Sequence, residues 1–162
     1  MSRSKFKSDA KKRDGTRFAG IPFVVLECEA YVGLSGSAVK LLMEFAFQYN
    51  GANNGNLYCT WEQMAQRGWK SQTTLKAAKD ELIGAGFLCE TRKGARPSKA
   101  SWYALTWRDL DVTDGLDIAP GAFPRSAYLR AGAPSVTRTV KPKAKPAAKI
   151  IPLTPVSGVA AA

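Results

Sequence analysis

The middle of this sequence contains two helices joined by a turn of three residues. The first helix is predicted over residues 61–67 and the second over residues 72–85, with Gly68-Trp69-Lys70 between them. Thr60 and Ser71 stand directly before the two helices, where a side-chain hydroxyl accepts hydrogen bonds from first-turn N–H groups that lack a partner within the helix. Because the connection is so short, we expect the helices to pack against each other as a helix-turn-helix.

A pair of strands around a basic hairpin follows the second helix. Gly86 stands where the chain leaves the helix, a position that favours a left-handed residue without a Cβ. Residues 87–91 and 101–107 then alternate in the period-two manner of paired strands. The segment between them has four positive charges and no negative one, at Arg92, Lys93, Arg96 and Lys99. We therefore predict an α+β fold, a winged helix-turn-helix with a three-helix core and a small antiparallel β-sheet wing.

The residues before this region supply the remaining elements. Residues 21–28 are rich in β-branched and aromatic side chains, which predicts a strand or an extended arm that packs on the domain. Ser35 is expected to cap a long helix, and residues 50–55 are expected to end it because Asn and Gly tolerate positive φ. The apolar residues of this helix recur every three or four positions, at Ala38, Leu41, Leu42, Phe45, Ala46 and Tyr49. Residues 56–59 predict a short strand.

The net charge of +11 is concentrated near the two ends of the chain. Residues 1–20 contain seven Lys/Arg and two Asp, and residues 119–162 contain seven Lys/Arg and no acid, so residues 21–118 carry only −1. We predict a basic flexible N-terminal tail over 1–20, the folded domain over 21–118, and a disordered Pro/Ala/Lys-rich tail over 119–162. Such tails attract phosphates without regard to sequence.

The composition leaves little support for an enzyme. There is no histidine, so the commonest general base and zinc ligand are absent. Cys28, Cys59 and Cys89 are widely spaced, which favours buried thiols in a reducing compartment. The acidic stretch that contains Asp109, Asp111, Asp114 and Asp117 lacks the glycine at the sixth position and the glutamate at the twelfth position of a calcium loop, and it is expected to be a solvated loop. We expect a non-enzymatic, cytoplasmic protein with no cofactor, no metal and no membrane segment.

Three segments are similar to winged-helix proteins of bacteriophages and mobile elements. They are Tyr49-Asn50-Gly51-Ala52-Asn53-Asn54-Gly55, Gly68-Trp69-Lys70-Ser71-Gln72-Thr73-Thr74-Leu75 and Glu81-Leu82-Ile83-Gly84-Ala85-Gly86-Phe87. The resemblance covers about residues 23–107 and includes the N-terminal DNA-binding domains of phage replication-initiation proteins. It implies binding to origin or operator DNA in a bacterial or phage-infected cell, where the protein would be associated with the nucleoid.

The second helix of a helix-turn-helix enters the DNA major groove, so its exposed first turns are the candidate reading surface. The predicted recognition residues are Lys70, Ser71, Gln72, Thr73, Lys76 and Lys79. The predicted wing contacts to DNA are Arg92, Lys93, Arg96 and Lys99. The opposite face of the helix, Leu75, Ala78, Leu82 and Ile83, is expected to be buried. The plain alternatives are a solvated helix face and a hairpin that serves only solubility.

The aromatic residues near this surface are assigned mainly to the core. Trp69 in the turn is expected to fill the core, with stacking on DNA as the alternative. Core or sheet-face positions are expected for Trp61, Trp102, Tyr103 and Trp107.

Two functional hypotheses follow. The first is a double-stranded DNA-binding protein that acts as a transcriptional regulator or a replication-initiation accessory. A homodimer and a replication or transcription protein partner remain open. The second is a winged-helix protein-interaction module whose basic tails alone bind nucleic acid.

Overall fold

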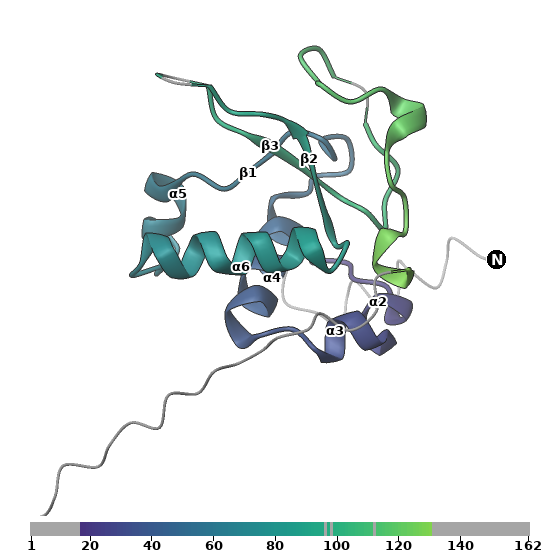
Figure 1. Cartoon of the computed structure of the whole chain (residues 1–162), viewed down its shortest axis with the longest axis horizontal. Helices are drawn as coiled ribbons and strands as arrows, with labels where there is room; N and C mark the ends of the chain where they lie inside the picture. Colours follow the sequence, from purple (N-terminus) through teal and green to yellow (C-terminus); the bar gives the residue numbers. More distant parts are fainter. Residues whose placement is uncertain (1–16, 96, 98, 112, 131–162) are drawn as a thin grey trace, which may run out of the picture.

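The structure is a computed structural model that describes residues 17–130 except 96, 98 and 112. The described part is α+β, with helices packed on a small antiparallel sheet (Figure 1). In Figure 1 the sheet lies above α4 and α6, and the short N-terminal helices lie below them. The elements are α2 (Phe23–Glu27), α3 (Glu29–Val32), α4 (Gly36–Gln48), β1 (Leu57–Tyr58), α5 (Trp61–Gln66), α6 (Gln72–Gly84), β2 (Leu88–Arg92), β3 (Trp102–Leu105) and the 3₁₀ turns η1 (Pro120–Ala122) and η2 (Ala127–Leu129).

The strand or extended arm expected over residues 21–28 is wrong, because this segment forms α2 and is followed directly by α3. A strand needs a partner to take up its backbone hydrogen bonds, whereas a helix takes up its own. Val25 is fully buried, but Phe23 is 79% exposed and its neighbour Val24 is also exposed. Only a few residues of this helical segment pack against the core. Tertiary packing therefore overrides the β-propensity of its side chains.

The central helices and their caps follow the sequence prediction. Ser35 accepts a hydrogen bond from Ala38 N–H at the start of α4, and Thr60 and Ser71 cap α5 and α6 in the same way. Ser35 also joins two helices, because the carboxylate of Glu81 on α6 accepts its backbone N–H at 2.6 Å and its hydroxyl at 2.7 Å. These bonds connect the amino end of α4 to the last turn of α6.

The sheet has the strand order β1-β3-β2, and both pairs are antiparallel. Leu57 of β1 faces Tyr103, and Leu88 of β2 faces Leu105, so large side chains of all three strands enter the core. The register of β2 shifts between Glu90 and Arg92, just before the hairpin.

Side-chain amides extend the hydrogen bonding of this small sheet. The amide of Gln48 pairs with both the N–H and the C=O of Tyr58 at 2.9 Å, in the manner of a neighbouring strand. Asn54 is fully buried and does the same for Leu105, accepting its N–H at 2.7 Å and donating to its C=O at 3.0 Å. Asn54 also donates to the C=O of Asp109 at 2.8 Å. The Asn-Asn-Gly segment is therefore a structural element of the domain.

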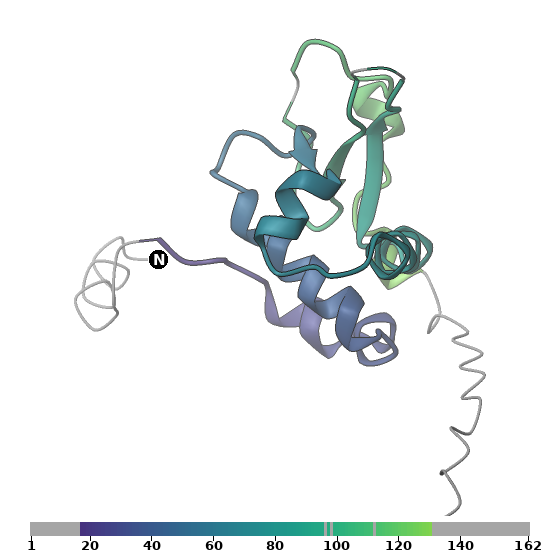
Figure 2. The same ribbon diagram turned by 90° about the vertical axis from the view of Figure 1, so that its left-hand side faces the viewer.

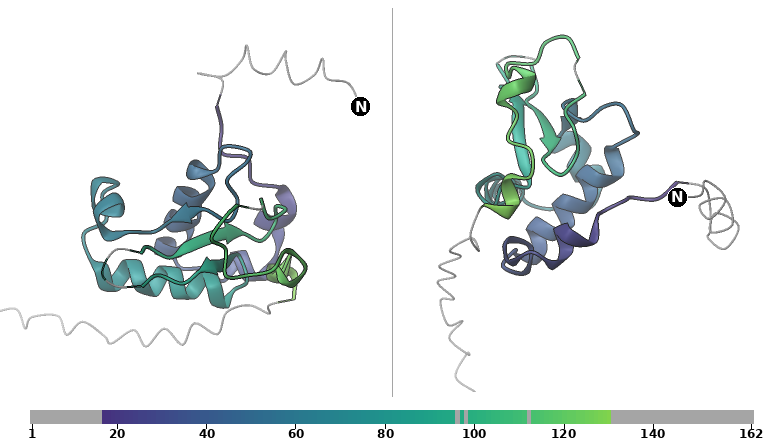
Figure 3. Two further views of the ribbon diagram at one scale, coloured as in Figure 1. Left: turned by 90° about the horizontal axis from the view of Figure 1, so that it is seen from above. Right: turned by 90° about the vertical axis from the view of Figure 1, so that its right-hand side faces the viewer.

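The folded region continues past residue 118, where the sequence prediction ended it. Tyr128 is buried and its ring stacks on Phe87, with centroids 5.4 Å apart. Ser126 N–H donates to Thr106 C=O at 2.8 Å. Gly86 has a φ of +76°, and a Cβ there would lie 2.7 Å from the backbone of Ala127. Figures 1 and 3 show this segment passing beside the β2–β3 hairpin and returning to the carboxyl end of α6.

Candidate nucleic-acid interface

The turn between α5 and α6 is anchored in the core. Gly68 takes a φ of +81°, which brings the next residue back toward α4. Trp69 is buried, and the ammonium group of Lys40 on α4 lies 5.0 Å from the centre of its ring. Trp69 is therefore a core residue, as predicted, and is covered on its outer side by Lys40.

The amino-terminal half of α6 presents polar side chains to solvent. Gln72, Thr73 and Lys76 are exposed, and so is Lys70 just before the helix. Ser71 is half-buried and its hydroxyl accepts the N–H of Thr74 at 3.3 Å, so this side chain is engaged as the helix cap. The predicted recognition residues thus divide into four with exposed side chains and two, Ser71 and Lys79, with structural contacts.

The buried face of α6 contains Leu75, Ala78 and Leu82, as predicted. Ile83, which was expected on this face, is 37% exposed. At 3.6 residues per turn, Ile83 lies about 80° around the helix from Leu75, whereas Leu82 lies within about 20° of it. The buried face of α6 is therefore narrower than the sequence predicted.

The two lysines in the middle of α6 differ in their surroundings. Lys76 forms an exposed ion pair with Asp80, one turn further along the helix. Lys79 is half-buried, with its ammonium group 5.6 Å from the centre of the Tyr103 ring. Burial opposes the charge of Lys79, but interactions with Tyr103, Cys59 and Asp80 outweigh it and raise the pKa of the lysine. Lys79 therefore leans toward the sheet and away from the exposed face.

A small pocket of about 140 Å³ lies between α5 and α6. It is lined by Cys59, Trp61, Gln72, Leu75, Lys76 and Lys79. Trp61 was expected in the core or on a sheet face, but it is 36% exposed at the first position of the short helix α5. This tryptophan is the surface residue that the sequence prediction missed. Its position at the very start of a six-residue helix was the available signal, since a first-turn residue has few helical neighbours to cover it.

Burial raises the pKa of the Cys59 thiol beside this pocket to about 11, against an opposing effect of Lys79. The described cysteines Cys28, Cys59 and Cys89 are all free and half-buried. Cys59 is therefore a protonated thiol at neutral pH.

The hairpin between β2 and β3 has exposed and engaged cations. Lys93 and Lys99 are exposed. Arg92 is engaged, because its guanidinium lies 3.3 Å from the centre of the Trp102 ring and donates to the C=O of Ala100 at 3.0 Å. Arg96 lies outside the described residues. The acidic segment 109–117 reaches this hairpin, since the carboxylate of Asp117 accepts the N–H of Lys93 at 2.8 Å.

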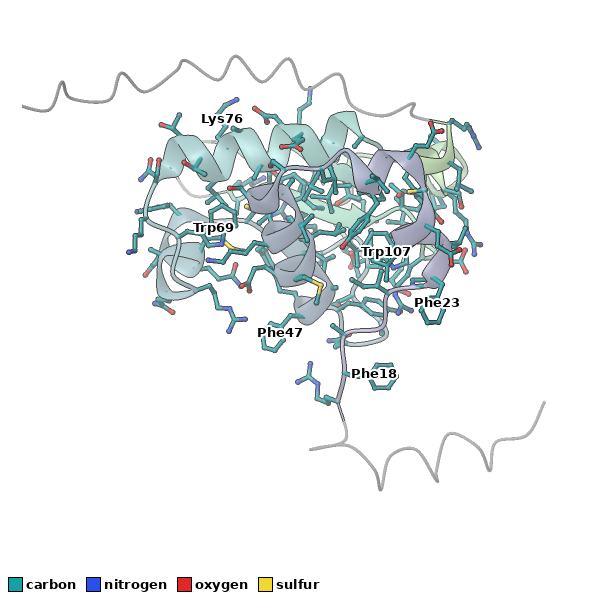
Figure 4. All side chains as sticks on the ribbon, turned by 90° about the horizontal axis from the view of Figure 1, so that it is seen from below. Phe18, Phe23, Phe47, Trp69, Lys76 and Trp107 are labelled. Atoms are coloured by element: carbon teal, nitrogen blue, oxygen red, sulfur yellow. The ribbon has the colours of Figure 1, made fainter. Side chains whose placement is uncertain are left out.

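The hairpin and the start of α6 lie on the same side of the molecule. Figure 2 looks at this side and shows α6 nearly end-on, with α5 beside it and the hairpin above. Figure 4 shows Lys76 pointing outward from α6. The exposed side chains at the start of α6 and in the hairpin thus belong to one side of the molecule. We call this set of residues the α6–hairpin surface, and it consists of Lys70, Gln72, Thr73, Lys76, Lys93 and Lys99.

Residues 17–130 contain thirteen Lys/Arg and eleven Asp/Glu in the sequence, a net charge of +2. Within the described part of the chain, no three or more Cys, Asp or Glu side chains come together as they would around a metal ion. None of the described helices is long and apolar enough to cross a membrane. No protein-family model, no curated protein and no solved structure matches this chain.

Proposed function

We propose that this chain is a non-enzymatic protein that binds double-stranded DNA through a winged-helix domain. In this proposal α6 enters the major groove and the β2–β3 hairpin lies along the phosphate backbone. The observation that carries the proposal is the α6–hairpin surface, in which Gln72, Thr73 and Lys76 are exposed along the first two turns of a 13-residue helix. The hairpin lysines extend from the same side of the domain.

The winged-helix assignment is supported by the order of the elements. A helix, α4, and a short strand, β1, precede α5 and α6, which are joined by a short connection of five residues, 67–71, that contains Trp69. The two strands that follow form an antiparallel pair with a basic hairpin at its tip. This is the arrangement expected for three core helices with a wing.

The chemistry of the exposed side chains suits DNA. An amide such as that of Gln72 can pair bidentately with adenine, and a lysine can donate to guanine or to a phosphate. The ion pair of Lys76 with Asp80 opposes DNA binding only weakly, because exposed ion pairs contribute about 0–1 kcal/mol to stability. A phosphate or guanine acceptor can therefore replace Asp80 as the partner of Lys76.

The cellular role proposed here rests on the resemblance to proteins of phages and mobile elements. We propose a transcriptional regulator or replication-initiation accessory that acts in the bacterial cytoplasm. A homodimer or a contact with a replication or transcription protein would be compatible with this role.

One observation favours the rival function, a protein-interaction module whose tails bind nucleic acid. The folded region is nearly neutral, and several of its cations are already engaged, including Lys79 over Tyr103 and Arg92 over Trp102. Nonspecific attraction to DNA would then come mainly from the basic residues outside 17–130.

Selection of bound duplexes from random DNA with the full chain, followed by substitutions, tests the leading proposal. Gln72→Ala and Lys76→Ala should each weaken binding to the selected duplex by about 1–3 kcal/mol if they contact bases. The matched control is Arg130→Ala, which removes an exposed cation that is not part of the α6–hairpin surface. If both α6 variants bind the selected duplex as tightly as the control does, α6 is not the reading element.

A further inference from the structure

A second, larger pocket of about 380 Å³ lies away from the α6–hairpin surface. Its walls come from the segment before α2, the carboxyl end of α4 and the segment after β3, and they include Arg17, Phe18, Phe47, Tyr49 and Arg108. Figure 4 shows Phe18 and Phe47 at the opposite edge of the molecule from Lys76. A ligand in this pocket would therefore leave the α6–hairpin surface free.

The charge of this pocket is positive. Two arginines, Arg17 and Arg108, line it, and no Asp or Glu does. Two acids lie close in the sequence to residues that line the pocket, but both form ion pairs with other arginines. Glu44 pairs with Arg67, and Asp109 pairs with Arg125. The carboxyl end of α4 contributes about half a negative charge, which two guanidinium groups exceed. The pocket is thus complementary to an anion.

Arg108 is held in place by neighbours that leave most of its donors available. Its guanidinium lies 4.2 Å from the centre of the Tyr49 ring and donates to the C=O of Gly20 at 3.1 Å. A guanidinium has five N–H donors. Among the described residues, the C=O of Gly20 is the one acceptor to which the guanidinium of Arg108 donates a hydrogen bond. A phosphate could therefore be bound without loss of the contact that holds the N-terminal segment.

Two phenylalanines that line the pocket are more than half exposed to solvent. Phe18 is 62% exposed and Phe47 is 55% exposed, although both line the pocket. The guanidinium of Arg67 lies 4.6 Å from the centre of the Phe47 ring. Exposed aromatic rings combined with arginines are the features with which proteins bind single-stranded nucleic acid, because every base has a face that can stack.

We propose that this pocket binds a nucleotide unit of single-stranded nucleic acid. Arg17 and Arg108 contact the phosphate, and the base stacks on Phe18 or Phe47. The volume is near the lower end of the range for ligand pockets, about 300–1,000 Å³, which suits a single nucleotide. An acidic peptide without aromatic side chains would match the charge but would not stack on the phenylalanines.

The test measures binding of the full chain to a fluorescein-labelled oligothymidylate of about 12 nucleotides, within the size range of single-strand sites. Fluorescence anisotropy would be recorded for Phe18→Ala, Phe47→Ala and Arg17→Ala. The matched controls are Phe23→Ala, an exposed aromatic outside the pocket, and Arg130→Ala, an exposed cation outside it. We expect about fivefold or greater weakening for each phenylalanine variant and less than about twofold for Phe23→Ala.

Arg17→Ala should weaken binding and reduce its dependence on salt, with Arg130→Ala as its reference. Thermal unfolding of each variant shows whether the fold is intact, and all five substitutions are at exposed positions. Wild-type affinity for the oligothymidylate in all three pocket variants would overturn the proposal. So would tighter binding of an acidic phenylalanine-containing peptide that the same three variants abolish, since this would identify a peptide site.

Binding to the selected duplex, measured in parallel, separates this proposal from the one for α6. The pocket variants should keep their duplex affinity, because the pocket and the α6–hairpin surface lie on different sides. A parallel loss of duplex affinity in the pocket variants would make the pocket part of the duplex interface and contradict a separate single-strand site.

Discussion

Asn54 is a buried polar residue whose side chain joins the loop before β1 to β3 and the segment after it. It makes three side-chain hydrogen bonds with backbone groups of Leu105 and Asp109. Asn54→Ala would remove all three bonds and take from the buried N–H of Leu105 its side-chain acceptor, while the C=O of Leu105 would keep the N–H of Arg108 at 3.3 Å. We expect the free energy of unfolding to fall by about 3 kcal/mol, measured by chemical denaturation.

The neighbouring Asn53 provides the control for this prediction. Asn53 donates to Gln48 C=O at 3.0 Å and accepts from Asn50 N–H at 2.9 Å, in a more exposed position. Asn53→Ala should cost only about 1 kcal/mol because water can replace the lost partners. An equal decrease in the free energy of unfolding for the two substitutions would mean that the buried hydrogen bonds of Asn54 stabilise the fold no more than the exposed ones of Asn53.

Cys59 should react slowly with electrophiles in the folded protein. Its pKa is raised from 9.0 to about 11, so at pH 8 the thiolate fraction is about 100-fold lower than for an unperturbed thiol. Alkylation by iodoacetamide, followed by peptide mass spectrometry, should be slower by a similar factor than in the chain unfolded in guanidinium. Burial favours the protonated thiol in the folded state, so the raised pKa stabilises the fold below about pH 9. This stabilisation is lost as the pH rises from about 9 through 11. Equal rates in the folded and unfolded chains would contradict the burial of this thiol.

Residues whose structure follows from local rules could be predicted from the sequence. The helix caps were predicted from the sequence and are present in the structure, at Ser35, Thr60 and Ser71. Capping depends on a residue's immediate neighbours. The exposure of Trp61 and Ile83 could not be predicted in this way. It depends on how far α5 and α6 are rotated against the sheet, which is set by contacts distant in the sequence.

At the scale of elements, the two central helices and the hairpin could be predicted with nearly correct bounds. α6 ends at Gly84 and was expected to reach residue 85, and β2 covers Leu88–Arg92 instead of 87–91. The error at α2 has a different origin. Its β-branched residues predict a strand, but the described sheet pairs β3 with β1 and β2 and gives residues 21–28 no partner.

The hairpin gives a prediction about charge. Asp117 accepts the N–H of Lys93, which puts a carboxylate beside a lysine expected to contact phosphate. Asp117→Asn keeps an oxygen acceptor and removes the negative charge. Duplex affinity at low salt should therefore rise by about two- to threefold, a change of the size typical for one exposed charge.

The control for Asp117→Asn is Glu29→Gln, which removes an exposed negative charge from α3. It should leave duplex affinity nearly unchanged in the same titration. An Asp117→Asn variant that binds no more tightly than Glu29→Gln would indicate that the hairpin does not approach DNA.

At the scale of the whole molecule, the segment after β3 completes the core. Tyr128 is buried against Phe87, so Tyr128→Ala should reduce the free energy of unfolding by about 3 kcal/mol. The exposed neighbour Leu129 is the control, and Leu129→Ala should change stability by less than about 0.5 kcal/mol. Similar stabilities for the two variants would mean that residues 119–130 are dispensable for the fold.

The extent of the domain could not be predicted from composition. Pro, Gly and Ala dominate residues 119–124, which is typical of a tail, yet one tyrosine and the glycine at position 86 bring the segment onto the core. The candidate site could be predicted in part. Residue type and helical spacing indicated the exposed side chains of α6, but the contacts of Lys79 and Arg92 with aromatic rings depend on the packed sheet.

The central claim is that the folded domain reads DNA and the basic ends of the chain add attraction without selectivity. The most direct test compares a fragment of residues 17–130 with the full chain on the selected duplex and on a shuffled duplex, at about 50 and 200 mM salt. The fragment should bind more weakly and with a shallower salt dependence, while keeping its preference for the selected duplex. Binding by the full chain and none by a folded fragment would contradict the claim and favour a protein-interaction module.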